Sequence, residues 1–401
     1  MDVLTHSVLP FVLILVVLVV VHELGHFITA RMAGVKVLEF GIGYPPKLWG
    51  ITRGETEYTI NALPLGGFVR LLGEEDPGDP RSLAAQSRLT RIFVLSAGAF
   101  MNLILAIILF AMALMIPHNT DISRASIVDV VPGSPAAKAG LQAGDVIFAI
   151  NHQNVQNIAE LGYRIRLHLG ETIDVLVKRP GTNGLEDIEV PVKARWTTST
   201  YVDKDGITRN QGPTGITISP HYGTQERLTP EEQAQIKKDL QPGETVPTTR
   251  LIPASETQRS NPLAAFKEGA IRAWEWVIFT VKWIISLVLS MTGGGQSGIG
   301  EEGVRGPVGI AQITGDVVKQ AGWQSLLELA AVISMSLAAL NILPLPMLDG
   351  GRVAFVVIEL LRGGKRIAPE REAMVHFVGL VAILGLAVVI TYFDVLRLFE
   401  G

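Results

Sequence analysis

The chain has 401 residues, of which 48% are hydrophobic and 18% are charged, and its mean hydropathy is +0.35. This composition is too apolar for an ordinary soluble enzyme and indicates a membrane protein of several spans with a more polar insert. The formal net charge of −4 provides no basic surface for nucleic acid, and the lack of cysteine excludes disulfides and thiolate metal ligands.

The first predicted element is a membrane span at about residues 8–30, which contains the motif H-E-L-G-H at residues 22–26. On a helix, His22 and His26 lie one turn apart on one face, so both imidazoles can bind one metal ion while Glu23 handles a proton. A rise of ~1.5 Å per residue places His22 roughly 20 Å along the span, within the membrane. A metal-free His-Glu-His helix is the alternative, but ionisable groups in a span are costly and seldom idle. The sequence after the motif has no small-residue cleavage site, which argues against a signal peptide.

The next segment, residues 31–91, is rich in arginine and lysine and is expected to be cytoplasmic, which puts the N-terminus outside. Within it we predict two short strands around Pro64, Leu65, Gly66 and Gly67. Such a hairpin beside a buried active site could offer its edge to an extended substrate backbone. A small cytoplasmic hairpin without this role fits the pattern equally well.

A second span is predicted at residues 92–116, where 25 consecutive positions are uncharged and Pro117 follows. The small residues Ala97, Gly98 and Ala99 would allow another helix to approach closely. Asn102 interrupts this span, and we expect it to make a packing hydrogen bond rather than to act in catalysis.

Residues 123–220 have the composition of a small polar α+β domain. Strands are predicted at 127–131, 146–150, 172–178 and 186–193, and helices at 135–140 and 158–169. The stretch G-S-P-A-A-K-A-G-L-Q-A-G-D-V-I resembles PDZ domains, which implies peptide binding at a sheet edge. A spacer with an unused groove is the alternative. A polar linker follows at 223–262, with a short helix expected at 229–240.

Residues 271–291 are long enough to span a membrane, but their charged side chains fall on one helical face and their tryptophans favour the interface. We therefore predict a helix that lies on the membrane, followed by a glycine-rich loop at 293–309.

The stretch 329–348 is uncharged but is broken by Pro344 and Pro346 and followed by Asp349. Irregular backbone at membrane depth requires protein or a water-filled cavity around it, so Asp349 is a candidate third metal ligand. A second cytoplasmic loop is predicted at 352–373 and a final outward span at 374–393. For Asp349 to meet the two histidines, the 271–291 helix cannot cross, and four spans result.

The H-E-L-G-H motif, the sequence N-I-L-P-L-P-M-L-D-G-G and the PDZ-like insert between them together resemble the site-2-type intramembrane zinc metalloproteases (M50 family), which include the bacterial regulators of sigma-E protease. The family motif N-x-x-P-x-P-x-L-D-G is matched at Asn341, Pro344, Pro346, Asp349 and Gly350. The predicted hairpin resembles the membrane-reentrant hairpin of the family. One departure is the sequence at residues 97–99, where the family often has A-G-P, and this puts a local helix bend in doubt.

We therefore expect a polytopic α-helical membrane protein with about four transmembrane helices, a membrane-associated β-hairpin and an inserted α+β PDZ-like domain. The expected parts are an N-terminal membrane domain (1–117), the PDZ-like domain (118–222), the linker (223–262), the interfacial helix with its loop (263–305) and a C-terminal membrane domain (306–401).

His22, His26 and Asp349 are expected to bind Zn²⁺, and Glu23 to act as the general base, although two histidines and a carboxylate would also accept Fe²⁺ or Co²⁺. Asn341, Pro344, Pro346, Leu65, Gly66 and Gly67 are candidates for substrate binding. For Asn341, a structural role at the end of the helix is an equal alternative.

The resemblance implies a bacterial inner-membrane protease that cleaves single-pass membrane proteins, such as pre-trimmed anti-sigma factors, or signal-peptide remnants. Its partners would be these substrates, membrane lipid, and a peptide or protein ligand of the PDZ-like domain, which could instead act as a size filter. The termini and this domain are expected outside the cytoplasm. A membrane metal carrier and a catalytically silent PDZ scaffold are the competing functions.

Overall fold

The computed structural model of the protein describes residues 4–400 except 75, 182–183, 199, 203–207, 222, 228, 231–232, 234–248, 294–295, 298–305 and 321. The chain forms two compact units. The helical unit comprises Met1–Ile116, Ser260–Thr280 and Val304–Gly401, and the insert unit comprises Pro117–Arg259 and Val281–Gly303.

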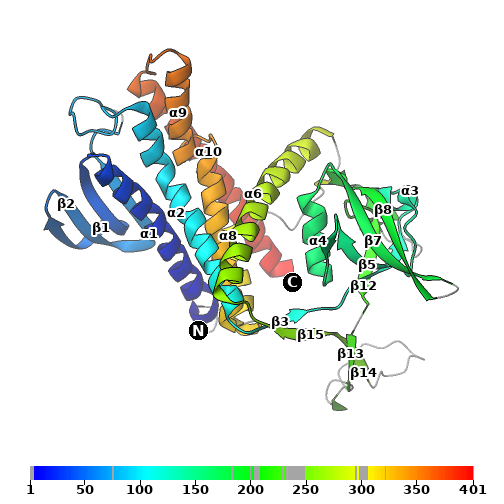
Figure 1. Ribbon diagram of the computed structural model, residues 1–401. Coiled ribbons are helices and arrows are strands. Elements are labelled where there is room, and N and C mark those ends of the chain that lie inside the picture. The colour runs from blue at the N-terminus through cyan, green and yellow to red at the C-terminus, as the bar shows by residue number, and fades with distance from the viewer. Residues whose placement is uncertain are drawn as a thin grey trace. The chain divides into compact units, whose positions relative to one another are not determined.

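The helices of the helical unit are long because the sequence supplies long apolar runs without helix breakers. After a short π-helix at Leu4–Val8, the helices are α1 (Leu9–Met32), α2 (Arg88–Met115), α6 (Pro262–Gly293, whose second half belongs to the insert unit), α7 (Pro307–Gln320), α8 (Gly322–Ile342), α9 (Asp349–Leu361) and α10 (Pro369–Glu400). Helix α2 packs against both α1 and α8 (Figure 1).

Five of the helices described are long and apolar enough to cross a membrane: Thr5–Met32, Arg88–Met115, Pro262–Ser290, Gln324–Ile342 and Pro369–Leu396. This is one more than the four spans that the sequence predicted. The additional candidate is the α6 segment, which we had assigned to the membrane surface and which has the lowest hydropathy of the five. The placement of α6 on the surface stays a prediction.

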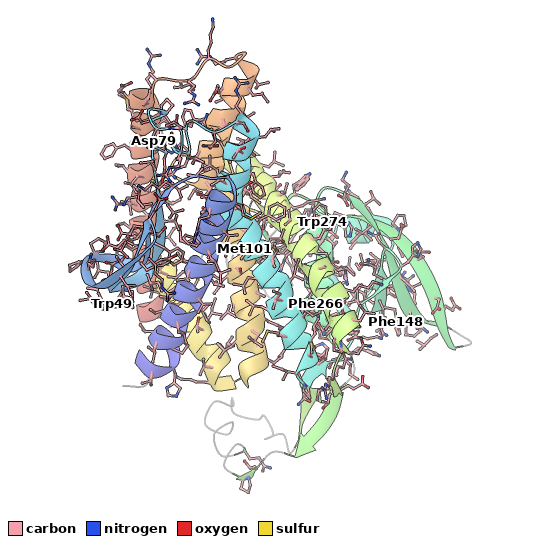
Figure 2. All side chains as sticks on the ribbon, turned by 60° about the vertical axis from the view of Figure 1, so that its left-hand side comes forward. Trp49, Asp79, Met101, Phe148, Phe266 and Trp274 are labelled. Atoms are coloured by element: carbon pink, nitrogen blue, oxygen red, sulfur yellow. The ribbon has the colours of Figure 1, made fainter. Side chains whose placement is uncertain are left out.

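The strands β1 (Val37–Arg53) and β2 (Thr56–Leu71) form an antiparallel hairpin between α1 and α2. The predicted strands around Pro64–Gly67 are present in the pairing of β2: Glu57–Ile60 runs parallel to Glu39–Ile42 on one side, and Gly67–Arg70 runs antiparallel to it on the other. The chain therefore reverses between Asn61 and Gly67, and a further turn at Gly54 and Glu55 joins β1 to β2. Gly54 takes a φ of +63°, which favours glycine. The hairpin carries many exposed apolar side chains, among them Trp49, which is labelled in Figure 2.

A buried cluster fixes the base of this hairpin to the helices. Ala30 of α1, Val37 and Leu71 of the hairpin, Val94 of α2 and Val356 of α9 belong to one core. Residues 352–373, predicted as a second cytoplasmic loop, contain most of α9, which continues through Leu361 and packs on α2. Their side of the membrane stays a prediction. The apolar spacing of Val353 and Val356, one turn apart, explains this helix.

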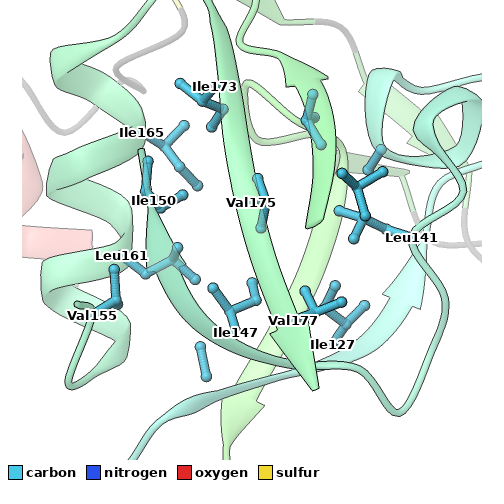
Figure 3. Packing of buried hydrophobic residues seen from close by; sticks show 14 of the residues in the cluster. Ile127, Leu141, Ile147, Ile150, Val155, Leu161, Ile165, Ile173, Val175 and Val177 are labelled. Carbon is cyan, nitrogen blue, oxygen red and sulfur yellow. The ribbon is translucent and has the colours of Figure 1, made fainter. Parts of the chain in front are cut away.

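The insert unit contains a six-stranded sheet in the order β12-β4-β5-β7-β8, with β6 paired to β5. Alternating residues of these strands and one face of α4 form its core (Figure 3). Its elements are β3 (His118–Asp121), β4 (Ala125–Val130), α3 (Pro135–Ala139), β5 (Val146–Ile150), β6 (Gln153–Asn154), α4 (Ile158–Leu167), β7 (Thr172–Gly181), β8 (Gly184–Lys193), β9 (Thr197–Thr198), β10 (Thr200–Val202), β11 (Thr208–Asn210), β12 (Ile216–Pro220), β13 (Gly223–Arg227), β14 (Thr249–Pro253), β15 (Ser255–Gln258) and β16 (Gln296–Ser297).

Two strands that are far apart in the sequence, at either end of residues 118–258, lie side by side in space. Strand β3 pairs with β15, so that Asp121 lies opposite Ser255 and His118 opposite Gln258. The interpretation of 223–262 as a plain linker was therefore incomplete, since β13, β14 and β15 lie in it. The helix expected at 229–240 falls almost entirely outside the described residues, as does most of the glycine-rich loop.

Candidate metal centre

The residues that the sequence predicted as metal ligands meet at one point in the helical unit. His22 and His26 project from the same face of α1, and Asp349 is the first residue of α9. The Oδ2 atom of Asp349 lies 3.0 Å from Nε2 of His22 and 3.2 Å from Nε2 of His26. The two Nε2 atoms are 3.3 Å apart, and each histidine is only 8% exposed.

Asp349 reaches this point because α8 and α9 are joined by a tight, non-helical turn. Helix α8 ends at Ile342, before the two prolines. A Cβ atom on Gly350 would lie 2.2 Å from the carbonyl oxygen of Leu343, and one on Gly351 would lie 2.2 Å from that of Leu345. Only glycine lets the turn fold back so closely on the start of α9, which explains the D-G-G sequence.

The second nitrogen of each imidazole has a partner on α2. Nδ1 of His26 lies 2.8 Å from the carbonyl oxygen of Val94, which can only accept, so this Nδ1 donates a hydrogen and Nε2 is left with a free lone pair. Nδ1 of His22 lies 3.3 Å from the side-chain amide of fully buried Asn102. Such partners fix the ring orientation and tautomer of metal-binding histidines.

The three converging atoms fit a metal ion. With its Nδ1 hydrogen donated to Val94, His26 presents a lone pair to a carboxylate oxygen, and two acceptors at this distance repel unless a proton or cation lies between them. Tetrahedral zinc with ligand bonds of about 2.0–2.1 Å separates its ligand atoms by about 3.3 Å. The observed separations of 3.0–3.3 Å agree with this geometry.

Helix α2 can lie this close to the imidazoles because it carries Gly98. A Cβ atom at Gly98 would stand 2.4 Å from Nε2 of His26 and 2.5 Å from Nε2 of His22. From the opposite side, a Cβ atom on Gly25 would stand 2.5 Å from the carbonyl oxygen of Ala97. The expected close helix approach at residues 97–99 is thus present between α1 and α2, and it reaches the metal ligands themselves.

Glu23 follows His22 on α1, and the hairpin passes beside it. A Cβ atom on Gly67 would lie 3.8 Å from Cγ of Glu23, and one on Gly66 would lie 3.1 Å from Cγ1 of Val19. Gly66 therefore lets β2 run against α1 near the predicted base, whereas the close neighbour of Gly67 is the Gly41 carbonyl oxygen of β1, 2.9 Å from such a Cβ atom. Gly67–Leu71 pairs with β1 on one side only among the described residues, which leaves a strand edge near Glu23.

The remaining predicted site residues lie in α8, in the turn between α8 and α9, and in β2. The side-chain amide of Asn341 donates to the carbonyl oxygen of Leu337 at 3.0 Å, which is the structural alternative for this residue. Pro344 and Pro346 lie in the turn before Asp349, and Pro346 is within contact of Gly379 on α10. The side chain of Leu65 lies outside the described part of the chain.

Two contributions to the site could not be recognised in the sequence. The Val94 carbonyl belongs to the backbone and leaves no side-chain signal, and Asn102 was expected only to pack. Among the described residues, one other group has suitable metal-ligand chemistry: His152, Asp174 and Glu189 in the insert unit. All three are exposed, and exposed groups of this kind are common without metal.

Two histidines and one carboxylate on apolar elements, with a further carboxylate beside them, define a metal-dependent hydrolase centre. Residues 10–386 match peptidase family M50. A Clostridium acetobutylicum protein whose name places it among the zinc metalloproteases is 31% identical to this chain, over 94% of both chains. The zinc metalloproteases RasP of Oceanobacillus iheyensis and Geobacillus kaustophilus are 29% and 26% identical, over 98% of this chain and 99% and 98% of theirs.

The chain therefore belongs to peptidase family M50, and it is a multi-pass membrane protein. The predicted enzyme class, a metalloprotease of the site-2 type, is confirmed. The names of these relatives describe zinc metalloproteases, which agrees with the predicted cofactor, Zn²⁺.

Proposed function

We propose that this protein is an intramembrane zinc metalloprotease that hydrolyses peptide bonds in or near the transmembrane segments of other membrane proteins. The observation that carries the proposal is the meeting of Asp349 with His22 and His26, which lie on a helix apolar enough to span the membrane. Idle ionisable groups at such a position would be costly.

In this mechanism His22 and His26, oriented by Asn102 and the Val94 carbonyl, hold the ion together with Asp349. When bound, zinc supplies Lewis-acid polarisation of the scissile carbonyl and lowers the pKa of water. Glu23 accepts the proton of the attacking water and delivers a proton to the leaving amine, so hydrolysis needs no covalent intermediate.

The substrate must be extended at the point of cleavage, because the amides of a helix are bonded internally and shielded. The edge of β2 at Gly67–Leu71 lies beside Glu23 and is suited to add an extended peptide as a further strand. Gly66 and Gly67, and the turn with Pro344 and Pro346, line this approach in our proposal. The exposed apolar side chains of the hairpin are compatible with contact with lipid.

For the insert unit we propose a PDZ-like domain outside the cytoplasm that restricts access by substrate size. Substrates would be single-pass proteins that another protease has already trimmed, anti-sigma factors among them, or signal-peptide remnants. The loop 31–91 and the region after α9 would then face the cytoplasm of a bacterial cell, since they are rich in arginine and lysine.

The experiment that tests this function maps the cut. A single-pass reporter protein is incubated with the purified enzyme, and the product termini are determined by mass spectrometry, with and without a chelator. We expect new termini inside or at the edge of the apolar segment, lost on chelation and restored by Zn²⁺. Cleavage confined to a water-exposed loop, or unaffected by chelation, would contradict the proposal.

A further inference from the structure

Three arginines converge on one carboxylate where α2 begins. Glu359 of α9 is 5% exposed, and its Oε2 accepts from Nη1 of Arg91 at 2.6 Å. Its Oε1 accepts from Nε of Arg88 at 3.2 Å and lies 3.6 Å from Nε of Arg366. One negative charge thus holds three positive charges together, which leaves an excess of two.

Most of the donors of these arginines are unused. A guanidinium offers five N–H groups, and among the described residues Arg88 uses only its Nε. Arg366 donates from Nη2 to the Ala84 carbonyl, and its Nη1 has no hydrogen-bond partner within the described part of the chain. Nε of Arg91 is buried without a hydrogen-bond partner, and the Arg91 side chain is 9% exposed. Arg91 does not line the larger cavity described below, so the donors available to a ligand there are those of Arg88 and Arg366.

Arg88 and Arg366 border open space. A cavity of about 460 Å³ is lined by Arg88, Arg366 and Glu359, by the N-cap residue Ser87 and by apolar side chains that include Leu89 and Leu360. A second cavity of about 190 Å³ shares Glu359 and Arg366 with it and reaches Arg91, with Glu372 on its far wall. Because Glu372 balances the charge there, an anion is favoured in the larger cavity.

The start of α2 adds to the positive potential. This helix has 28 residues, and the Ser87 side chain caps the amide of Thr90, while Ser87, Arg88 and Leu89 line the larger cavity. A helix N-terminus favours a negative charge, and its amides and nearby guanidinium groups are the donors that bind phosphate best.

We propose that this cavity binds the phosphate of an anionic membrane lipid. The lipid source, rather than free phosphate, is indicated by position: Arg88 is the first residue of a helix apolar enough to span the membrane, where headgroups lie. Leu89 is 79% exposed and Phe93, one turn further, is 52% exposed, so acyl chains can lie along α2 beside the bound headgroup. A basic pocket between helices at the membrane surface is a known kind of headgroup site.

The test uses the full chain in detergent and measures the dissociation constant for phosphatidylglycerol by native mass spectrometry, with phosphatidylcholine and inorganic phosphate as separate arms. Arg88→Gln and Arg366→Gln each remove one charge from the cavity. Lys365→Gln is the matched control, because Lys365 is exposed next to Arg366 and does not line the cavity.

We expect wild type and Lys365→Gln to bind phosphatidylglycerol equally, and each arginine variant to bind about fivefold more weakly. Arg88→Lys, which keeps the charge, should retain most of the affinity and shows that loss in Arg88→Gln is not misfolding. Equal binding by all variants would overturn the proposal. So would equal binding of phosphatidylcholine, or competition by millimolar inorganic phosphate, which would point to a soluble anion.

Discussion

Gly98 shows how a residue without a side chain governs the metal centre. In a Gly98→Ala variant the added Cβ would overlap both imidazoles, since it would stand 2.4 and 2.5 Å from their Nε2 atoms. Displacement of catalytic groups by about 1 Å can cost a hundredfold in rate, so we expect a loss of bound zinc and activity lower by at least roughly 100-fold. Metal content and reporter cleavage measure both effects.

Gly385→Ala is the matched control for that variant. Gly385 lies in another candidate span, and a Cβ atom there meets open space. It should bind zinc and cleave as wild type does. If Gly98→Ala also retained full zinc and activity, the close packing of α2 on the two histidines would be refuted.

Asn102 is predicted to orient His22 for metal binding. Nδ2 of Asn102 faces Nδ1 of His22 in the structure, and Oδ1 of Asn102 is buried without a partner among the described residues. When Nε2 of His22 binds metal, Nδ1 carries a hydrogen, and the Asn102 amide, turned over by 180°, presents Oδ1 as the acceptor. Loss of such a partner typically weakens metal affinity about 10–100-fold, which we expect for Asn102→Ala. Asn102→Asp keeps an acceptor oxygen and should restore most of the affinity, as zinc competition with a fluorescent chelator would reveal. Equal weakening by both substitutions would indicate a packing role only.

At the scale of elements, the ion pair of Arg91 and Glu359 joins α2 to α9 and so helps to hold Asp349 in place. Burial by itself would raise the pKa of Glu359, but hydrogen bonds from Arg91 and Arg88 outweigh it and hold the pKa below the ordinary value. The pair therefore contributes its full stability above the unfolded pKa of about 4.5, and the contribution is lost as the pH falls through the lowered folded value.

Glu359→Gln should accordingly lower the free energy of unfolding by about 3 kcal/mol near neutral pH, because it leaves Arg91 buried without a carboxylate. Below the folded pKa the difference from wild type should shrink. Unfolding curves in detergent between pH 3 and 7 would test this, with exposed Glu370→Gln as the control. A difference that does not depend on pH would argue against an ionised Glu359.

The elements also show where sequence patterns were sufficient. Strand β5 has the predicted bounds, and the predicted helix end at Gly140 is a left-handed C-cap with φ of +88°. The turn predicted at P-L-G-G is present, since the chain reverses between Asn61 and Gly67, whereas strand β1 was not predicted. Gly41, Gly43, Pro45 and Pro46 interrupt the sequence of β1, and glycine and proline weaken the strand pattern on which the prediction depends.

For the candidate site, the sequence indicated the converging residues but not the groups that orient them. His22, Glu23 and His26 lie within five residues, and the prolines before Asp349 mark an interruption, so these four residues could be singled out. The partners of the imidazoles come from α2, some 70 to 80 residues away along the chain. Which of many buried groups lies against an imidazole depends on helix packing, and the sequence has no pattern for it.

At the scale of the whole molecule, residues 123–253 of the insert unit lie between two strands that pair with each other, β3 and β15. The backbone amide of Ile122 donates to the Ala254 carbonyl at 2.8 Å, beside the paired strands β3 and β15. We therefore expect that residues 123–253 can be replaced by an Asn-Gly turn. If the insert filters substrates by size, this variant should cleave untrimmed and trimmed reporters at similar rates. A variant that cuts trimmed reporters only would contradict the filter.

The central claim is that Glu23 acts as the base beside an ion held by His22, His26 and Asp349. The most direct measurement compares wild type and Glu23→Gln for zinc content and for cleavage of a fluorescent transmembrane reporter. Because Glu23 is not one of the three converging ligands, both proteins should hold about one zinc ion, and only wild type should cleave. Cleavage by Glu23→Gln at the wild-type rate, or zinc binding by both with no cleavage by either, would contradict the account.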